Sequence, residues 1–304
     1  MEQTSIRQLR RVLVSAVLSS MMLCASFSAH AQQGFFTPED VIKYTPDWHG
    51  ERFPDGRPKV PDAILDRMKS VTLEEAWAVV ENAGFMHQYE DGWLSIHPDK
   101  VLVGRALTAV WMPGRPDIQK LIEAQGVQDK RQGAMNAWPV DMLQPRDVYV
   151  ADHFGLKVDG PSIGDNVGNA IYAKSGNGIV YDGAVRDING LDELPNFTAF
   201  VRYYDPSHHY GSLRSGKLLN STMVSINGPT RIGHATAMPG MSCWGGTAAS
   251  SLSRRNLPSR WLRVLSQPIS AMYLATRGWK KRNTPRARSM LDGQMRLSRI
   301  IAHG

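Results

Sequence analysis

Long apolar runs alternate with amphipathic segments through the middle of the chain. Residues 101–112 are almost continuously apolar, which predicts a strand buried on both faces. Shorter apolar runs predict further strands at 147–152, 178–181, 198–202, 223–226 and 231–237, the last two as a pair. Amphipathic spacing predicts helices at 61–69, 72–82, 118–124 and 167–174. This alternation favours an α/β domain over a helical bundle or an all-β sandwich.

The segment 32–70 has a different pattern. Thr37, Pro38 and the two acids that follow predict a short capped helix. Residues 32–60 are rich in proline and glycine, and no part of 32–70 has a motif with an assignable chemistry. We expect it to form an ordered arm on the surface of a domain that spans 71–240.

The first 31 residues have the pattern of an export signal. Arg7, Arg10 and Arg11 precede an apolar run, and Ala29 and Ala31 fit the −3 and −1 positions of a cleavage site. We therefore expect an exported, periplasmic protein with no membrane span after signal removal. An uncleaved anchor is the alternative, and the choice between the Sec and twin-arginine routes stays open.

The formal net charge of +7 is concentrated at the C-terminus. Residues 241–304 hold twelve Lys or Arg and one acid, Asp292, whereas the preceding residues hold 27 acids and 23 bases. The main domain is thus slightly acidic, and we expect no nucleic-acid partner. Once a signal containing Cys24 is removed, only Cys243 remains, which excludes an intramolecular disulfide and a cysteine-based zinc site.

A glycine-flanked turn, Gly164-Asp165-Asn166-Val167-Gly168, precedes the predicted helix 167–174. Backbone N–H groups at a helix N-terminus lack intrahelical partners and can bind a carboxylate or phosphate. The spacing is not that of a dinucleotide-binding loop. Taken alone, the turn is more typical of an ordinary helix start.

Arg186 and Asp187 follow the predicted strand 178–181 closely. Open α/β sheets bind ligands at the carboxyl ends of their strands. Arginine matches a carboxylate or keto acid, and aspartate is a hard oxygen ligand for Mg²⁺ or Mn²⁺. With few carboxylates nearby, a hydrated Mg²⁺ fits better than a caged Ca²⁺. A structural ion pair is the alternative.

The two motifs are separated by twenty residues, from Asp165 to Arg186, and this spacing resembles the signature of the RraA-like family. That family includes the 4-hydroxy-4-methyl-2-oxoglutarate and 4-carboxy-4-hydroxy-2-oxoadipate aldolases. The resemblance extends to the segments 104–108, 147–152, 183–187 and 232–240. It implies a swivelling β/β/α domain, here with an N-terminal arm and an irregular C-terminal tail, assembled as a homotrimer or hexamer.

The resemblance also implies roles for individual residues. Arg186 would bind the keto or carboxylate oxygen of a 2-oxo acid substrate, and Asp187 would hold the divalent metal. Backbone amides for the carboxylate of a pyruvate unit would come from Gly164, Asp165, Asn166 and Val167. The implied activity is that of a class II (metal-dependent) pyruvate aldolase, a lyase using retro-aldol cleavage. Decarboxylation of oxaloacetate would leave the same enolate, which a Lewis acid and a cation stabilise.

The chain departs from the family pattern after Gly240. From Met241 onward the sequence shows neither helical nor strand periodicity and almost no acids, while apolar residues persist. A disordered basic tail is one interpretation. Our hypothesis is a frameshift in the gene near Met241, which translation of the other two reading frames would test.

Three functions of different classes follow from these patterns. The leading one is the metal-dependent lyase. The second is a non-catalytic binding or regulatory protein on the same scaffold. The third is nucleic-acid binding through the basic tail, which would be sensitive to salt.

Overall fold

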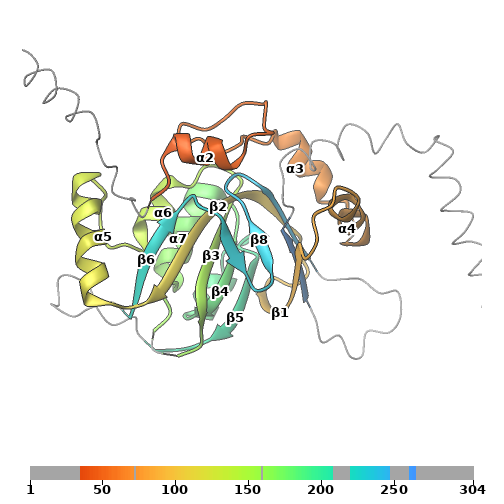
Figure 1. Ribbon diagram of the computed structural model, residues 1–304. Helices are drawn as coiled ribbons and strands as arrows, with labels where there is room; N and C mark the ends of the chain where they lie inside the picture. Colours follow the sequence, from red (N-terminus) through yellow and green to blue (C-terminus); the bar gives the residue numbers. More distant parts are fainter. Residues whose placement is uncertain (1–34, 72, 159, 208–219, 247–259, 265–304) are drawn as a thin grey trace, which may run out of the picture. The chain divides into compact units, whose positions relative to one another are not determined.

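Strand β2 (Leu102–Pro113) is the strand around which the sheet is organised (Figure 1). The computed structural model describes residues 35–71, 73–158, 160–207, 220–246 and 260–264. Within these, β2 is buried along nearly its whole length, as its continuous apolar run predicts. The predicted signal peptide and most of the predicted tail lie outside the described residues.

Four strands form the parallel part of the sheet. β2 pairs with β3 (Asp147–Leu156), β3 with β4 (Ile179–Val185), and β4 with β5 (Ala199–Tyr204), all in parallel. Helices connect them: α5 (Pro116–Gln128) and α6 (Ala137–Met142) precede β3, α7 (Asp165–Ser175) precedes β4, and α8 (Ile188–Asp192) precedes β5. The predicted alternation of strands and helices is confirmed.

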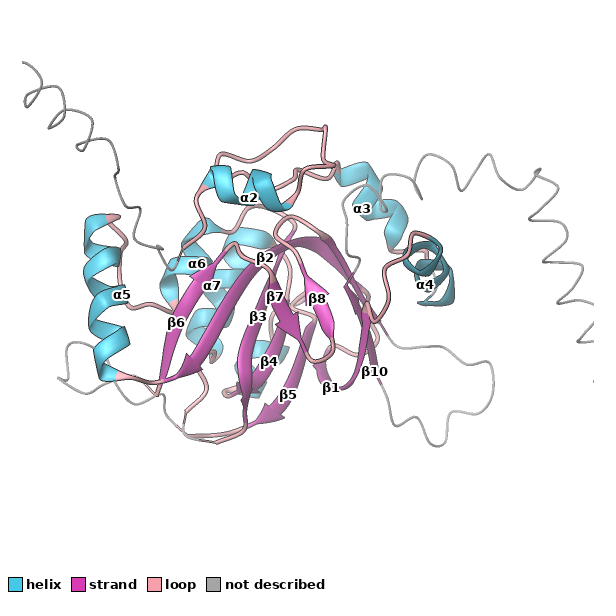
Figure 2. Cartoon of the chain, in the orientation of Figure 1, coloured by secondary structure: helices cyan, strands magenta, loops and turns pink. Residues whose placement is uncertain are grey.

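The sheet closes on itself. β1 (Tyr89–Ile96) runs antiparallel to β5, β10 (Arg260–Val264) pairs with β1, and β9 (Ser242–Gly246) pairs with both β10 and β2. Because β2 also pairs with β3, seven strands form a ring. β6 (Ser221–Ile226) pairs with β2 farther along the edge that β9 occupies. Figure 2 shows the hairpin of β7 (Thr230–Ile232) and β8 (Ala235–Ala237) in front of this sheet.

Alternate residues of the strands pack into two different hydrophobic clusters, because successive side chains of a strand point to opposite faces. Val148, Val150 and Val180 share one cluster with residues of β1, β5 and β9, which is the interior of the ring. Tyr149 and Tyr181 point the other way and pack with residues of α6, α7 and α8. In Figure 1, α6 and α7 are seen behind β6 and β2.

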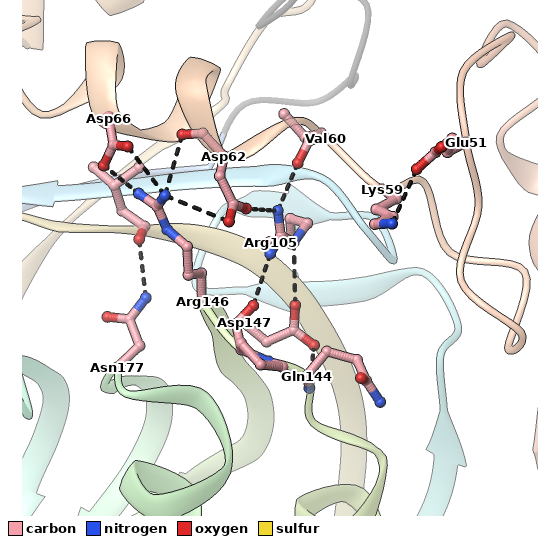
Figure 3. Close-up of polar contacts among 12 residues, drawn as sticks. Glu51, Lys59, Val60, Asp62, Asp66, Arg105, Gln144, Arg146, Asp147 and Asn177 are labelled. Carbon is pink, nitrogen blue, oxygen red and sulfur yellow. Dashed lines mark hydrogen bonds and ion pairs between the residues drawn. The ribbon is translucent and has the colours of Figure 1, made fainter.

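Buried and partly buried ion pairs attach the arm to the domain. It contains α2 (Pro38–Tyr44), with the predicted Thr37 cap, and α3 (Asp62–Met68), and it leads into α4 (Leu73–Asn82). Arg57 is fully buried and donates from Nη1 to Asp147 Oδ2 at 2.8 Å. Arg105 of β2 donates to Asp62 and to the Val60 carbonyl, as Figure 3 shows.

Several predicted elements differ from the observed ones. The segments 223–226 and 231–237 do not pair with each other: β6 pairs with β2, and the second segment folds back on itself as β7 and β8. Helix α5 continues past Gly126 to Gln128, and glycine is needed at that position because the ring of Trp138 occupies the space of a side chain. The expectation of no strand after Met241 is wrong, since β9 begins at Ser242.

The described part of the chain contains no helix that is both long enough and apolar enough to cross a membrane.

Candidate functional site

The turn at Gly164 and the Arg186-Asp187 pair, twenty residues apart, lie side by side in the structure. Ile163 and Val185 form a parallel bridge, and the Arg186 N–H donates to the Ile163 carbonyl at 3.1 Å. The chain leaves this bridge into α7 on one side and into α8 on the other. The predicted juxtaposition of the two motifs therefore has a backbone basis.

Gly164 is the point of closest approach between them. A Cβ built on it would lie 3.0 Å from Arg186 Nε, 3.1 Å from Arg186 Cγ and still closer to Asp187 Oδ2. These separations are shorter than the 3.4 Å at which ordinary contact begins. The backbone of Gly164 has φ −128° and ψ −164°, which any residue can adopt. Glycine is required here by space and not by conformation.

Some of the amides at the start of α7 already donate hydrogen bonds within the turn. The Asn166 N–H donates to Asp165 Oδ1 at 2.7 Å, and the Gly168 N–H donates to the Gly164 carbonyl as the first helical bond. Among the first amides of α7, those of Asp165 and Val167 have no intrahelical acceptor. A ligand carboxylate would therefore meet two amides directly and would compete with the Asp165 side chain for the third.

Asp187 has a backbone conformation that is uncommon outside glycine. Its φ of 54° and ψ of 44° place it in the left-handed region, where it precedes α8 without capping it. Such conformations cost on the order of 1–3 kcal/mol and cluster at functional sites. Its carboxylate lies 3.4 Å from Arg186 Nε, and the two side chains are 39% and 26% exposed. The turn thus directs this carboxylate toward Arg186 and Gly164.

A cavity of about 460 Å³ opens at this end of the sheet. Two chain segments line it, residues 185–190 after β4 and residues 204–206 after β5. Arg186 and Asp187 belong to its wall, while the turn residues 164–167 lie beside them and outside the lining. Asp165 instead packs against Gly190, whose added Cβ would be 2.9 Å from Asp165 Cβ.

The sequence reasoning missed the second wall of this cavity. Tyr204 ends β5, and Asp205 and Pro206 follow it as Arg186 and Asp187 follow β4. The Asp205 N–H donates to the Val185 carbonyl at 3.0 Å, which brings the two strand ends together. The rule that ligands bind at the carboxyl ends of parallel strands would have found these residues.

A second set of charges lies away from the cavity. Arg202 donates to Asp182 Oδ1 at 2.9 Å and to Glu90 Oε1 at 2.5 Å, and Asp182 also accepts from the Gly233 N–H. Burial raises the pKa of the nearby Asp152, and the charge of Asp182 adds to that rise. Because these groups mostly pair with one another and fasten the β7–β8 hairpin, we assign them a structural role.

The residues at the cavity fit one kind of metal ion. Among the described residues, no group of three or more His, Cys, Asp or Glu side chains could hold an ion by itself. Mg²⁺ commonly binds through one or two carboxylates and fills its other positions with water and substrate. Asp187, half-exposed at the cavity wall, suits such an ion and does not suit one that needs a protein cage.

The sequence matches the model of a protein family described as RraA-like, Aldolase/RraA, over residues 60–247. The chain belongs to the RraA-like family. The match covers the segments from α3 to β9 and includes both motifs of the site. This RraA-like family includes metal-dependent aldolases and also non-catalytic RNase inhibitors. No curated relative matches this sequence.

Solved structures share the fold of this RraA-like chain. Streptomyces coelicolor RraAS2, described as an unusual member of the RNase ES inhibitor RraA protein family, has a TM-score of 0.54 at 18% identity, with 78% of this chain and 100% of that chain covered. A structure described under novel cellulases from gut-associated microbes has a TM-score of 0.55 at 15% identity, covering 86% and 96%. An uncharacterised protein from Pseudomonas syringae pv. tomato str. DC3000 has a TM-score of 0.51 at 18% identity, covering 84% and 95%. At these identities, the likeness establishes the fold alone.

Proposed function

We propose that this RraA-like protein is a divalent-metal-dependent lyase that cleaves a 4-hydroxy-2-oxo acid by a retro-aldol reaction. The observation that carries the proposal is the packing of Gly164 against Arg186 and Asp187 at the wall of a cavity. The first turn of α7, the Arg186 guanidinium and the Asp187 carboxylate then lie together beside one cavity. Decarboxylation of oxaloacetate would place the same demands on these groups.

The amides of α7 and Arg186 would bind and orient the substrate. Two amides at the helix N-terminus suit the substrate carboxylate, because their N–H groups have no helical acceptor. Arg186 is a permanent cation, and it is fixed by its backbone bond to Ile163 and by its contact with Asp187. It would therefore face the 2-oxo oxygen in one orientation.

The reaction breaks the bond between C3 and C4 of the substrate. The electron pair moves toward C2 and places negative charge on the former keto oxygen, while the C4 hydroxyl gives its proton to a water molecule and becomes a carbonyl. Arg186 would stabilise the resulting pyruvate enolate, which then takes a proton at C3. Fixed cations that face developing charge commonly account for a large part of such rate enhancements.

Asp187 would hold the metal, Mg²⁺ or alternatively Mn²⁺. When bound, such an ion supplies Lewis-acid stabilisation of the same oxygen. No lysine is required for a Schiff base in this scheme.

The test is pyruvate release from 4-hydroxy-2-oxo acids, with Mg²⁺ and after EDTA treatment. We expect Arg186→Ala and Asp187→Ala to lower kcat/KM by at least 10²-fold, as removal of one charge-stabilising donor does in other enzymes. The matched controls are Arg115→Ala and Asp117→Ala, which remove an exposed Arg–Asp pair at the start of α5. These controls should retain full activity.

Absence of turnover, or turnover unaffected by both site variants, would contradict the lyase. The non-catalytic binding protein on the same scaffold would then be favoured, provided that 2-oxo acids still bind. Export to the periplasm and assembly as a homotrimer or hexamer stay predictions. Cell fractionation would test the first and analytical ultracentrifugation the second.

A further inference from the structure

The two walls of the cavity carry opposite chemistry. The wall after β4 contributes Arg186 and Asp187, which form an ion pair with each other. The wall after β5 contributes Asp205 between Tyr204 and Pro206. The cavity lining therefore has one cation and two anions, and the anion of the second wall has no function in the proposed chemistry.

Neutral donors hold the Asp205 carboxylate in place. Oδ1 accepts from the Ser207 N–H at 3.1 Å, Oδ2 accepts from the Ser207 hydroxyl at 2.6 Å, and the Gly160 N–H lies 3.5 Å from Oδ2. In the described part of the chain, no Lys, Arg or His lies within ion-pair distance of Asp205. Its negative charge is thus oriented by hydrogen bonds, and no cation of the described residues pairs with it.

Asp205 is also ionised at neutral pH. The hydrogen bond from the Ser207 side chain lowers the pKa of Asp205, and the Ser207 and Gly160 amides lower it further. Neutralisation of this carboxylate by a proton would disrupt those bonds. The second wall therefore keeps its charge whenever a substrate enters.

We propose that Asp205 selects 2-oxo acids with a single carboxylate, whose far end is uncharged, over those with a second carboxylate. The inference rests on the proposed function, because it places the keto-acid end of the substrate at Arg186. It makes oxaloacetate, which has a second carboxylate, a poorer substrate than a 4-hydroxy-2-oxo acid with one carboxylate. The remainder of the substrate then extends toward the wall after β5. A hydroxyl or alkyl group there meets Tyr204 and Pro206, whereas a second carboxylate meets the like charge of Asp205.

Like-charge repulsion is a common means of rejecting a wrong ligand. The carboxylate is partly exposed, so solvent screens part of its effect. We expect a discrimination of about tenfold between matched substrates, which corresponds to 1.4 kcal/mol.

The experiment compares two substrates in which the same bond, C3–C4, is cleaved. 4-Hydroxy-2-oxopentanoate has one carboxylate, and 4-hydroxy-4-methyl-2-oxoglutarate has two. The protein should prefer the first, and Asp205→Asn should shift the kcat/KM ratio about tenfold toward the second. Asp205→Glu keeps the charge and should keep the preference. Asp192→Asn is the control, since it removes an exposed acid from the end of α8 that does not line the cavity.

Calorimetric binding of 2-oxobutanoate and 2-oxoglutarate gives a readout that does not require turnover. A binding ratio that shifts in Asp205→Asn while no variant turns over would support Asp205 as the selector and contradict the lyase. Normal turnover with equal ratios in the wild type and Asp205→Asn would overturn the role of Asp205 and leave the lyase standing. Failure of both ligands to bind the folded wild type would overturn both. Thermal unfolding of each variant identifies any that has lost its fold.

Discussion

Replacement of Gly164 by alanine tests the site most directly. The backbone angles of Gly164 suit alanine, so the variant introduces one methyl group without backbone strain. That methyl group would overlap the Asp187 carboxylate and would lie 3.0 Å from Arg186 Nε. Relief of the overlap requires movement of the two side chains to which we assign metal and substrate.

The size of the effect follows from the distances. Arg186 Nε must retreat by about 0.4 Å to reach the 3.4 Å of ordinary contact, and Asp187 Oδ2, which is closer, must move further. Misplacement of catalytic groups by about 1 Å can cost on the order of 10²-fold in rate. We expect a loss of about 10- to 10²-fold in kcat/KM, because the Asp187 carboxylate must move by on the order of 1 Å. The free energy of unfolding should fall by only about 1 kcal/mol, the low end for overpacking, because side-chain ends give way more readily than backbone.

The assay measures kcat/KM by pyruvate release and stability by urea unfolding on the same preparations. Gly168→Ala is the matched control, because a Cβ there would overlap Leu191 on the apolar side of α7 and would not touch Arg186 or Asp187. It should lose stability and keep its activity while folded. Retention of full activity by Gly164→Ala would refute the reasoning. An equal loss of activity in folded Gly168→Ala would show that general disturbance of α7 is the cause.

Two further predictions concern the buried charges. Arg57→Met should reduce the free energy of unfolding by about 3 kcal/mol, because it leaves the Asp147 carboxylate buried without its closest cation, and Arg57→Met with Asp147→Asn should recover part of the loss. Equal urea midpoints for the single and double variants would contradict this. Burial raises the pKa of Glu90, but hydrogen bonds from the His234 backbone and from Arg202 outweigh it and leave the pKa below its ordinary value. This stabilisation is present above the unfolded pKa of about 4.5 and is lost as the pH falls through the folded pKa, so the Tm of Glu90→Gln should decrease less on acidification than that of the wild type. Parallel Tm curves for the two proteins would argue against the assignment.

The sequence predicted those elements whose pattern records burial directly. Residues 101–112 read as a buried strand because both faces of β2 are covered, one by the ring interior and the other by helices or the arm. The site motifs were found from the positions of charges after apolar runs. Their contact in space follows from the parallel bridge at Ile163, which no local pattern records.

Other elements were missed because long-range contacts override their local pattern. Residues 89–96 carry two acids and a glycine, which disfavour a strand, yet β1 forms because Arg202 pairs with Glu90 and covers Trp93. The helix predicted at 118–124 is too short, since the contact of Gly126 with Trp138 cannot be seen along the chain. Asp205 was overlooked because its partner segment, after β4, is distant in sequence.

The closure of the ring affects the order in which the protein can be made. β1 and β2 leave the ribosome long before β9 and β10. The edge of β1 that pairs with β10 and the edge of β2 that pairs with β9 therefore have unpaired backbone groups until the C-terminal strands are synthesised. Exposed strand edges favour association between chains. A chain terminated at Gly240 would keep every residue of the proposed site and both of these edges. Its failure would therefore be seen as aggregation during synthesis and not as a defect in substrate binding.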